Sequence, residues 1–187
     1  FEADDILGTM ARRCEEAGIP ALLVTGDRDS MQLVTATSSV LYTKRGVSEV
    51  VRYTPERVLE DFGVTPQQIP DLKGLMGDAS DNIPGVPGIG EKTALALVQK
   101  FGSLAGVYDH LDDPAIKPKQ REKLAANREL AELSHTLGTI RRDAQVDRDT
   151  SAYRGHEGGQ HHGWMLLSEQ EMPKLTIHKE TEDGHRT

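Results

Sequence analysis

A short apolar run that ends in two aspartates is the feature that most constrains the fold of this 187-residue chain. Ala21-Leu-Leu-Val24 is followed directly by Thr-Gly-Asp-Arg-Asp, which is typical of a buried parallel strand whose carboxyl end opens into a loop. In open α/β sheets, ligands usually bind at that edge. The run therefore predicts an α/β fold that places Asp27 and Asp29 at the ligand-binding edge of its sheet.

Periodic patterns around this run predict an α/β core over residues 1–65. Apolar residues before the run recur at helical spacing, and a Gly-Ile-Pro sequence ends that pattern. The residues after it favour strands and then a helix with proline at its first position. The expected elements are a helix at Asp4–Glu16, strands at Ala21–Val24, Val40–Tyr42 and Glu49–Tyr53 around a turn at Gly46, and a helix from Pro55.

The pattern changes after Gly63 to helices separated by glycine and proline. Helices are expected over Glu91–Lys100 and from about Pro118 to Leu137, so residues 66–149 are predicted to form an all-helical module. From about Thr150 the chain is rich in glycine, histidine and charge and shows no period. This composition predicts a disordered tail over residues 150–187.

The net charge of −8 is unfavourable for nucleic-acid binding if it is taken as a whole. The acids, however, gather in three clusters within the first 81 residues, and the stretch after Ile89 has a basic excess. An acidic metal pocket beside a basic surface is compatible with DNA binding. Cys14 is the only cysteine, which excludes an internal disulfide and fits a reducing cytosol. No apolar run approaches the ~20 residues that span a bilayer, so no membrane segment is predicted.

Seven carboxylates make up the three acidic clusters. Each cluster alone is explained as well by helix capping or by a turn, because acids near helix N-termini complement the helix dipole. Seven converging carboxylates would instead require hard divalent cations, and oxygen-only ligands suit Mg²⁺ or Mn²⁺. Two such ions about 4 Å apart catalyse in-line phosphodiester displacement. The clusters are Glu2, Asp4 and Asp5, then Asp27 and Asp29, then Asp78 and Asp81, whose spacing would place them on one face of a helical turn.

A glycine-rich turn precedes the helix expected from Glu91. Gly85, Gly88 and Gly90 put small residues directly before that helix, where backbone N–H groups can meet an anion such as a DNA phosphate. A helix–turn–helix corner that needs glycine only for close packing explains the same pattern. A nucleotide-binding loop does not, because neither Gly-x-x-x-x-Gly-Lys-Ser/Thr nor Gly-x-Gly-x-x-Gly is present.

Three motifs together resemble the 5′-nuclease domain of bacterial DNA polymerase I. They are Phe-Glu-Ala-Asp-Asp at the start, Thr-Gly-Asp-Arg-Asp, and Gly-Asp-Ala-Ser-Asp-Asn-Ile-Pro-Gly-Val-Pro-Gly-Ile-Gly-Glu-Lys-Thr-Ala over residues 77–94. The resemblance covers about residues 1–149 and implies a PIN-like parallel-sheet core followed by a helix–hairpin–helix module. It implies 5′-3′ exonuclease and 5′-flap endonuclease activity on DNA in replication and repair, with metal-bound water as the nucleophile.

The resemblance also implies roles for individual residues. All seven clustered acids would be ligands of two Mg²⁺ or Mn²⁺ ions or would support those ligands, with Asp5, Asp27, Asp29 and Asp78 at the catalytic centre. The hairpin would grip duplex DNA without reading its sequence, with a K⁺ ion at the turn carbonyls. The DNA-binding residues are then Gly85, Gly88, Gly90, Lys92 and Thr93.

Family members have a further N-terminal strand, which carries another metal-binding aspartate, and a helical arch. The resemblance therefore implies an N-terminally truncated, weakly active or inactive piece that is continuous with polymerase domains in a monomeric, cytoplasmic, nucleoid-associated bacterial protein. Without the missing strand, apolar faces such as Ala21–Val24 are expected to be exposed. The alternative is a non-catalytic, sequence-independent DNA-binding module in which the acids are structural.

Overall fold

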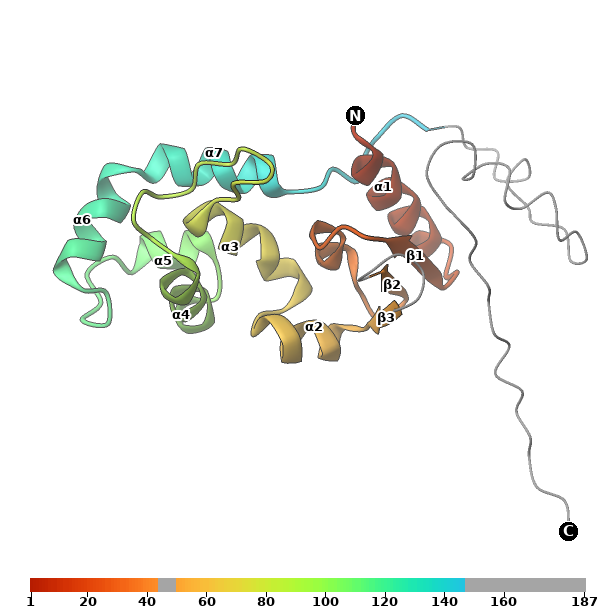
Figure 1. The fold of residues 1–187 in the computed structure, drawn as a ribbon, viewed down its shortest axis with the longest axis horizontal. Coiled ribbons are helices and arrows are strands. Elements are labelled where there is room, and N and C mark those ends of the chain that lie inside the picture. Colours follow the sequence, from red (N-terminus) through yellow and green to blue (C-terminus); the bar gives the residue numbers. More distant parts are fainter. Residues whose placement is uncertain (44–49, 147–187) are drawn as a thin grey trace, which may run out of the picture.

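The computed structural model describes residues 1–43 and 50–146, with a small sheet at one end and helices at the other (Figure 1). The strands β1 (Ala21–Thr25), β2 (Ser38–Thr43) and β3 (Val50–Tyr53) form one sheet in the order β1-β2-β3. The first pair is parallel, with Ala21 opposite Ser38, and the second is antiparallel, with Val40 opposite Tyr53. The sheet is therefore mixed. The turn predicted at Gly46 and the tail predicted from residue 150 lie outside the described residues.

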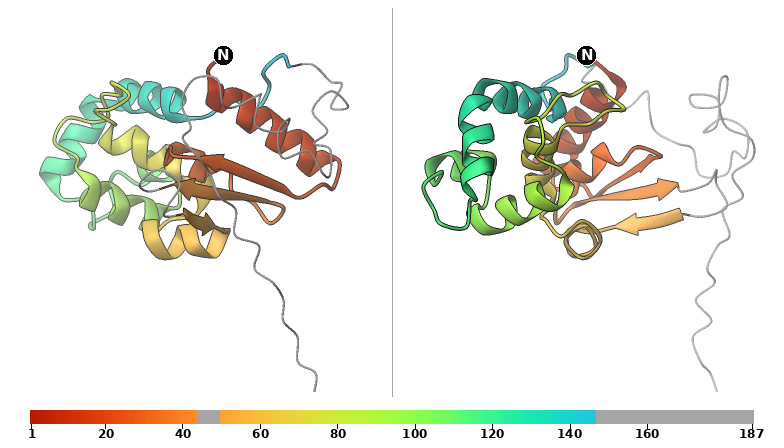
Figure 2. Two further views of the ribbon diagram at one scale, coloured as in Figure 1. Left: turned by 45° about the vertical axis from the view of Figure 1, so that its right-hand side comes forward. Right: turned by 60° about the vertical axis from the view of Figure 1, so that its left-hand side comes forward.

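The predicted first helix and the loop after the first strand are both present. Helix α1 (Ala3–Glu16) lies along the sheet and contacts β1 (Figure 2). A 3₁₀ helix, η1 (Asp29–Leu33), follows β1, and its Met31 and Leu33 side chains are buried in the core. These two side chains fix the acid-bearing loop to the sheet, because burial of each apolar side chain stabilises this arrangement by roughly 1.5–3 kcal/mol.

The expected exposure of the first strand is confirmed for two of its apolar residues. In β1 the side chains of Leu22 and Val24 are 51% and 45% exposed, whereas Leu23 is buried. This alternation follows from the strand period of two, which sends successive side chains to opposite faces. One face of β1 packs on the core and the other meets solvent.

The rest of the described chain is helical. Two helices and a 3₁₀ turn were not predicted from the sequence, namely α3, α5 and η2. The elements are α2 (Pro55–Phe62), η2 (Pro66–Gln68), α3 (Ile69–Met76), α4 (Glu91–Phe101), α5 (Leu104–Asp109), α6 (Pro118–Ala126) and α7 (Arg128–Gly138). In residues 1–43 and 50–146, no helix is long and apolar enough to cross a membrane.

The helical stretch predicted from about Pro118 to Leu137 is present, but it is divided into α6 and α7 at Asn127. Asn127 has φ −127° and ψ 28°, and its backbone N–H donates to Leu124. Its side-chain amide donates to the carbonyl of Lys123 at 2.8 Å. Asparagine side chains that bond to nearby backbone groups compete with helix continuation, which accounts for the corner between α6 and α7.

Helix α3 packs closely on α7. A Cβ on Gly74 would lie 3.2 Å from the carbonyl oxygen of Ala131, and one on Gly138 would lie 3.0 Å from the Cβ of Lys73. Buried Ser134 on α7 donates to the Leu130 carbonyl and accepts the backbone N–H of Gly85 at 2.9 Å. Helix α7 thus supports both α3 and the glycine-rich loop that follows it.

After α7 the chain returns to α1 (Figure 1). The Arg141 N–H donates to a carboxylate oxygen of Asp5 at 2.9 Å, and the Ala144 N–H donates to the hydroxyl of Thr9 at 2.9 Å. Gly8 allows this approach, since a Cβ there would lie 2.8 Å from Ile140. The start and the end of the described chain are therefore joined beside the sheet.

Gly85→Ala is expected to destabilise the protein by about 2–4 kcal/mol. Gly85 has φ +62°, and an added Cβ would lie 2.2 Å from the backbone nitrogen of Gly77, where no flexible side chain can yield. Gly90→Ala is the matched control, because Gly90 has φ −95° and open space around it. Urea unfolding should show a large loss for the first variant and a change within about 0.5 kcal/mol for the second. Equal stabilities would contradict the tight loop.

Candidate metal centre

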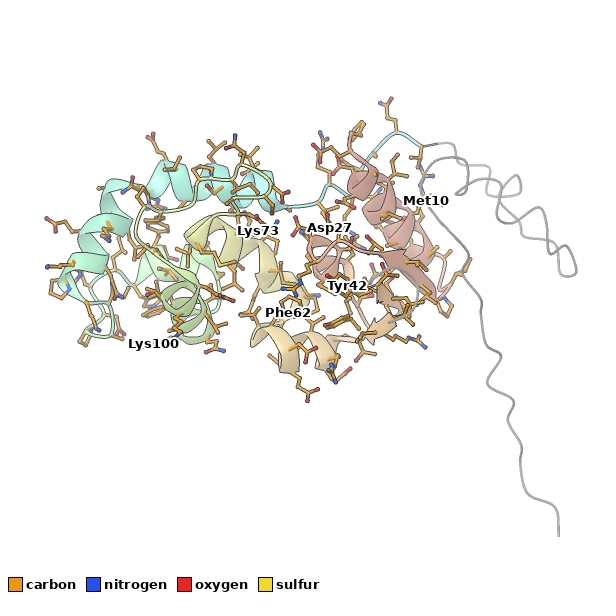
Figure 3. All side chains as sticks on the ribbon, in the orientation of Figure 1. Met10, Asp27, Tyr42, Phe62, Lys73 and Lys100 are labelled. Carbon is orange, nitrogen blue, oxygen red and sulfur yellow. The ribbon has the colours of Figure 1, made fainter. Side chains whose placement is uncertain are left out.

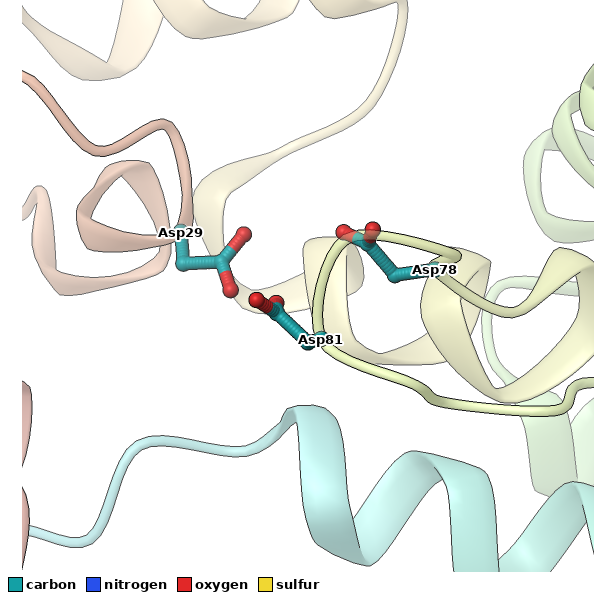
Figure 4. Close-up of side chains that lie close together, drawn as sticks. All are labelled: Asp29, Asp78 and Asp81. Atoms are coloured by element: carbon teal, nitrogen blue, oxygen red, sulfur yellow. The ribbon is translucent and has the colours of Figure 1, made fainter.

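Three carboxylates from two distant segments meet between the sheet and the helices. Asp29 begins η1, and Asp78 and Asp81 lie on the loop after α3 (Figure 4). One oxygen from each lies within 4.8 Å of the others. Across the described residues, no other group of three or more histidine, cysteine or acidic side chains comes this close. This acidic triad, Asp29, Asp78 and Asp81, is the candidate metal centre.

The loop that carries two of these acids is held by its own backbone. Asp78 and Ile83 exchange two backbone hydrogen bonds of 2.8 Å, and Gly77 and Asn82 have positive φ values of 73° and 57°. Asp78 and Asp81 therefore lie on a tight loop, and the predicted helical turn that they would share is wrong. The loop is preferred because the bridge satisfies backbone groups that a helix would have paired differently.

Ser80 fixes one of the three carboxylates. Its backbone N–H donates to Asp78 at 2.9 Å and its hydroxyl donates to the same oxygen. These bonds, opposed by burial and assisted by Lys73, lower the pKa of Asp78 to about 2. The Asp78 carboxylate is therefore ionised at any physiological pH.

Lys73 stands at the centre of the triad. Its ammonium contacts Asp29 and lies 3.0 Å from both Asp78 and Asp81. The residue is only 4% exposed, and its aliphatic stem packs against Gly138 of α7, which directs the ammonium toward the acids. Burial lowers the pKa of Lys73, but the hydrogen bonds to the three carboxylates raise it by more than burial lowers it. The net shift of this pKa is therefore upward.

Lys73 was not among the site residues predicted from the sequence. The available signal was a lysine within the largely apolar stretch Ile69–Met76, whose other charged residue is Asp71, shortly before Asp78. Buried lysines are rare unless they are paired, so such a lysine in a buried helix points to a nearby acidic partner.

Asp29 has the opposite pKa shift to Asp78. Burial raises its pKa to about 6, although hydrogen bonding and the charge of Lys73 oppose the rise and the charge of Asp27 adds to it. The triad thus combines one carboxylate that ionises near pH 2 with one that holds its proton up to about pH 6.

The other four predicted acids lie around the triad in two different roles. Burial raises the pKa of Asp4, and the charges of Asp27, Glu2, Asp5 and Asp81 raise it further, which brings the three acidic clusters within electrostatic reach of one another. Asp27 accepts the backbone N–H of Asp29 at 2.9 Å. Asp5 instead accepts the N–H groups of Glu2 and Arg141 and so holds the start of α1 in place. None of these four joins the close group that the triad forms.

The three carboxylate oxygens of the triad suit a divalent cation. All three donors are carboxylate oxygens, which hard cations prefer. The position of the Lys73 ammonium shows that these oxygens can share a single cation. Figure 3 places Asp27 on the sheet side and Lys73 on the helical side of the boundary between the two parts. The triad spans the same boundary, because Asp29 comes from η1 and Asp78 and Asp81 from the loop after α3 (Figure 4).

Two cavities open beside the triad. One of about 610 Å³ is lined by Asp29, Lys73 and Asp78 together with Tyr53, Phe62 and Leu95. The other, of about 500 Å³, is lined by Asp27, Asp29, Asp78 and Asp81. The candidate centre is therefore accessible to a substrate.

The glycine-rich turn adopts the conformation that its glycines permit. Gly85 and Gly88 have positive φ, and Gly90 is the extended residue before α4. Lys92 and Thr93 lie in the first turn of α4 and line a cavity of about 320 Å³ together with Lys100 of the same helix and Lys117 at the start of α6. The ammonium of Lys123 donates to the carbonyl of Gly88 at 3.2 Å, so a protein cation already lies at one turn carbonyl.

Lys73→Met is expected to lower the free energy of unfolding by about 2–3 kcal/mol without divalent ions, because it leaves three neighbouring carboxylates without their cation. Millimolar Mn²⁺ should restore part of this loss by neutralising the same oxygens. Lys100→Met is the matched control, since its partner Asp113 lies in an exposed pair worth at most about 1 kcal/mol. Urea unfolding with and without Mn²⁺ measures both effects. A Mn²⁺ response that is the same in both variants would contradict a shared cation site.

The chain is similar in sequence to bacterial DNA polymerase I proteins. The chain is 51% identical to DNA polymerase I of Bacillus caldotenax over 160 residues, which is 84% of this chain and 18% of that protein. It is 45% identical to DNA polymerase I of Bacillus subtilis over 157 residues, which is 83% of this chain and 18% of that protein. The chain thus spans less than a fifth of the length of these relatives.

Solved structures show the same fold. A bacteriophage T5 5′-exonuclease with bound zinc matches with a TM-score of 0.64 at 29% identity, over 73% of this chain and 49% of that one. A T5 flap endonuclease in a complex with DNA and metal ions matches with a TM-score of 0.64 at 28% identity, over 74% of this chain and 50% of that one. The catalytic core of Rad2 with DNA matches with a TM-score of 0.51 at 19% identity, over 80% and 50%, which supports the fold alone.

Family models agree with these relatives along most of the chain. Residues 1–63 match the N-terminal resolvase-like domain of 5′-3′ exonucleases, and residues 64–160 match their C-terminal SAM fold. The fold class and family predicted from the sequence motifs are confirmed. Together with the acidic triad and the glycine-rich turn, these matches show that the chain belongs to the 5′-3′ exonuclease family.

Proposed function

We propose that this chain is the metal-binding and DNA-gripping part of a 5′-3′ exonuclease and 5′-flap endonuclease of a DNA polymerase I. The observation that carries the proposal is the acidic triad, in which Asp29 meets Asp78 and Asp81 across a large sequence separation. Such a cluster of like charges is costly without a cation. Support also comes from the related T5 enzymes, whose structures contain metal ions and, in one case, DNA.

In this proposal the clustered acids would hold Mg²⁺ or Mn²⁺ at two sites, and the chemistry that such ions would supply is activation of water and stabilisation of the leaving oxygen of a phosphodiester. Asp29, Asp78 and Asp81 hold one site. Asp4 and Asp27, whose charges interact, would contribute to the second, with Glu2 and Asp5 supporting the start of α1. Ser80 keeps the Asp78 carboxylate ionised and oriented through two hydrogen bonds.

The hairpin supplies DNA binding in the same proposal. Gly88 and Gly90 are exposed before the start of α4, and Lys92 and Thr93 lie beside them. Gly85 is buried and its N–H donates to Ser134, so its part in the proposal is to shape the turn rather than to meet a phosphate. A helix N-terminus with a lysine suits a phosphate. The acidic loop and this hairpin are consecutive in sequence, so DNA held by one is presented to the other. We assign residues 1–65 to the metal-binding core and residues 66–149 to the DNA-binding module, with K⁺ at the turn carbonyls and a monomeric state as parts of the proposal.

One observation favours a second function, that of a non-catalytic DNA-binding module. Lys73 already neutralises the triad, so the acids could hold α3 against η1 without any metal. The two functions differ in whether divalent ions bind at the triad.

Asp78→Asn is expected to weaken Mn²⁺ binding at least about tenfold and to reduce cleavage of a 5′-flapped oligonucleotide by about 100-fold or more, because one ligand charge is lost. Calorimetric Mn²⁺ titration is the primary readout, since it does not depend on turnover. Asp112→Asn is the control. The Asp112 side chain is 99% exposed and pairs with Arg121, and it lines neither of the two cavities beside the triad. DNA binding by the wild-type chain with no Mn²⁺ binding would favour the second function.

Lys92→Gln is expected to weaken binding of duplex DNA of any sequence and to reduce the slope of log affinity against log salt by about 1, which is the effect of one lost phosphate contact. Lys119→Gln, an exposed substitution on α6 outside the cavity that Lys92 lines, is the control. Fluorescence anisotropy across a series of salt concentrations measures the slope. An unchanged slope for Lys92→Gln would remove this residue from the interface.

A further inference from the structure

Arg28 lies at the boundary between the two cavities beside the acidic triad. It lines both of them, as do Asp29 and Asp78. Its neighbours Asp27 and Asp29 belong to the same short loop after β1, and its backbone is helical, with φ −71° and ψ −22°. The Asp27 carboxylate accepts the Asp29 N–H across Arg28, so the position of the Arg28 backbone is fixed while its side chain reaches outward.

The guanidinium of Arg28 is available to an external anion. The residue is exposed, and no hydrogen bond or ion pair holds its side chain within residues 1–43 and 50–146. Both adjacent carboxylates are engaged elsewhere, because Asp27 accepts the Asp29 N–H and Asp29 contacts Lys73. An arginine between two acids would otherwise be expected to pair with one of them.

Arg28 is also the cation that the cavities offer to a substrate. In the smaller cavity it is the one basic residue among those lining it, beside four aspartates. In the larger cavity the other basic residue is Lys73, which is buried and occupied by the triad. A DNA phosphate that approaches the triad therefore meets a single accessible positive charge.

We propose that Arg28 is a positioning residue that binds one DNA phosphate beside the acidic triad and so fixes the strand over Asp29 and Asp78. The proposal rests on the nuclease function proposed above and adds a specific contact to it. A guanidinium suits this role because its planar fork donates two parallel hydrogen bonds to phosphate oxygens, and it stays charged at all relevant pH values. It also offsets the repulsion between the acidic pocket and the DNA backbone.

The test uses the full chain and 5′-flapped duplexes in which one phosphate at a time is replaced by an uncharged methylphosphonate. Binding is measured by fluorescence anisotropy with Ca²⁺ present. The variants are Arg28→Gln and Arg28→Lys, with Arg12→Gln as control, because Arg12 pairs with Glu16 on the surface of α1 away from both cavities. Mn²⁺ titration of each variant reports whether the triad remains intact.

The wild-type chain should lose about tenfold in affinity when one particular phosphate near the flap junction is neutralised, which corresponds to loss of a charged hydrogen-bonded contact. Arg28→Gln should bind the unmodified duplex about tenfold more weakly and should be insensitive to methylphosphonate at that same position. Arg28→Lys should keep part of the affinity, and Mn²⁺ binding should be unchanged in all variants.

Two results would overturn the assignment of Arg28 alone. One is wild-type affinity for DNA in Arg28→Gln, and the other is a profile of phosphate sensitivity identical to that of the wild type. If the wild-type chain bound neither DNA nor Mn²⁺, the nuclease function and the role of Arg28 would both be wrong, so the two failures are distinguishable.

Discussion

The contact between the Lys73 ammonium and three aspartates is the interaction on which the candidate site depends. It joins η1, which follows strand β1, to the loop that follows helix α3. A buried lysine is costly unless its charge is fully paired, and three neighbouring carboxylates are costly unless a cation lies between them. Each side of the contact therefore requires the other, and the requirement holds the two parts of the molecule at a fixed distance.

The surrounding helices make that contact possible. Close packing of α3 on α7 at Gly74 and Gly138 buries the stem of Lys73, and Ser134 on α7 holds Gly85 in the loop that continues from the acids. The segment after α7 then returns to α1, where the Arg141 N–H donates to Asp5 and holds its carboxylate in place. The acidic triad and the glycine-rich turn thus share one support, α7, which fixes their positions relative to each other.

Several features follow from local sequence alone. The apolar run before Asp27, the proline at the start of α2 and the glycines before α4 each specify a local conformation, and the structure contains all of them. The resemblance of three motifs to a nuclease family rested on residue order and is confirmed. The helical stretch over residues 118–137 is present, but its division at Asn127 was not predicted, because helical periodicity carries no signal for the side-chain bond of Asn127 that ends α6.

The sequence by itself determined which residue types were available, namely seven acids in three clusters and a glycine-rich turn before a basic helix. Only the tertiary structure decided that Asp29, Asp78 and Asp81 form the close group, and that Lys73 lies at its centre. It also decided that Asp5 holds the segment after α7. The physical reason is that charge proximity depends on packing between segments far apart in the chain. Periodicity and spacing report only on neighbours within one element.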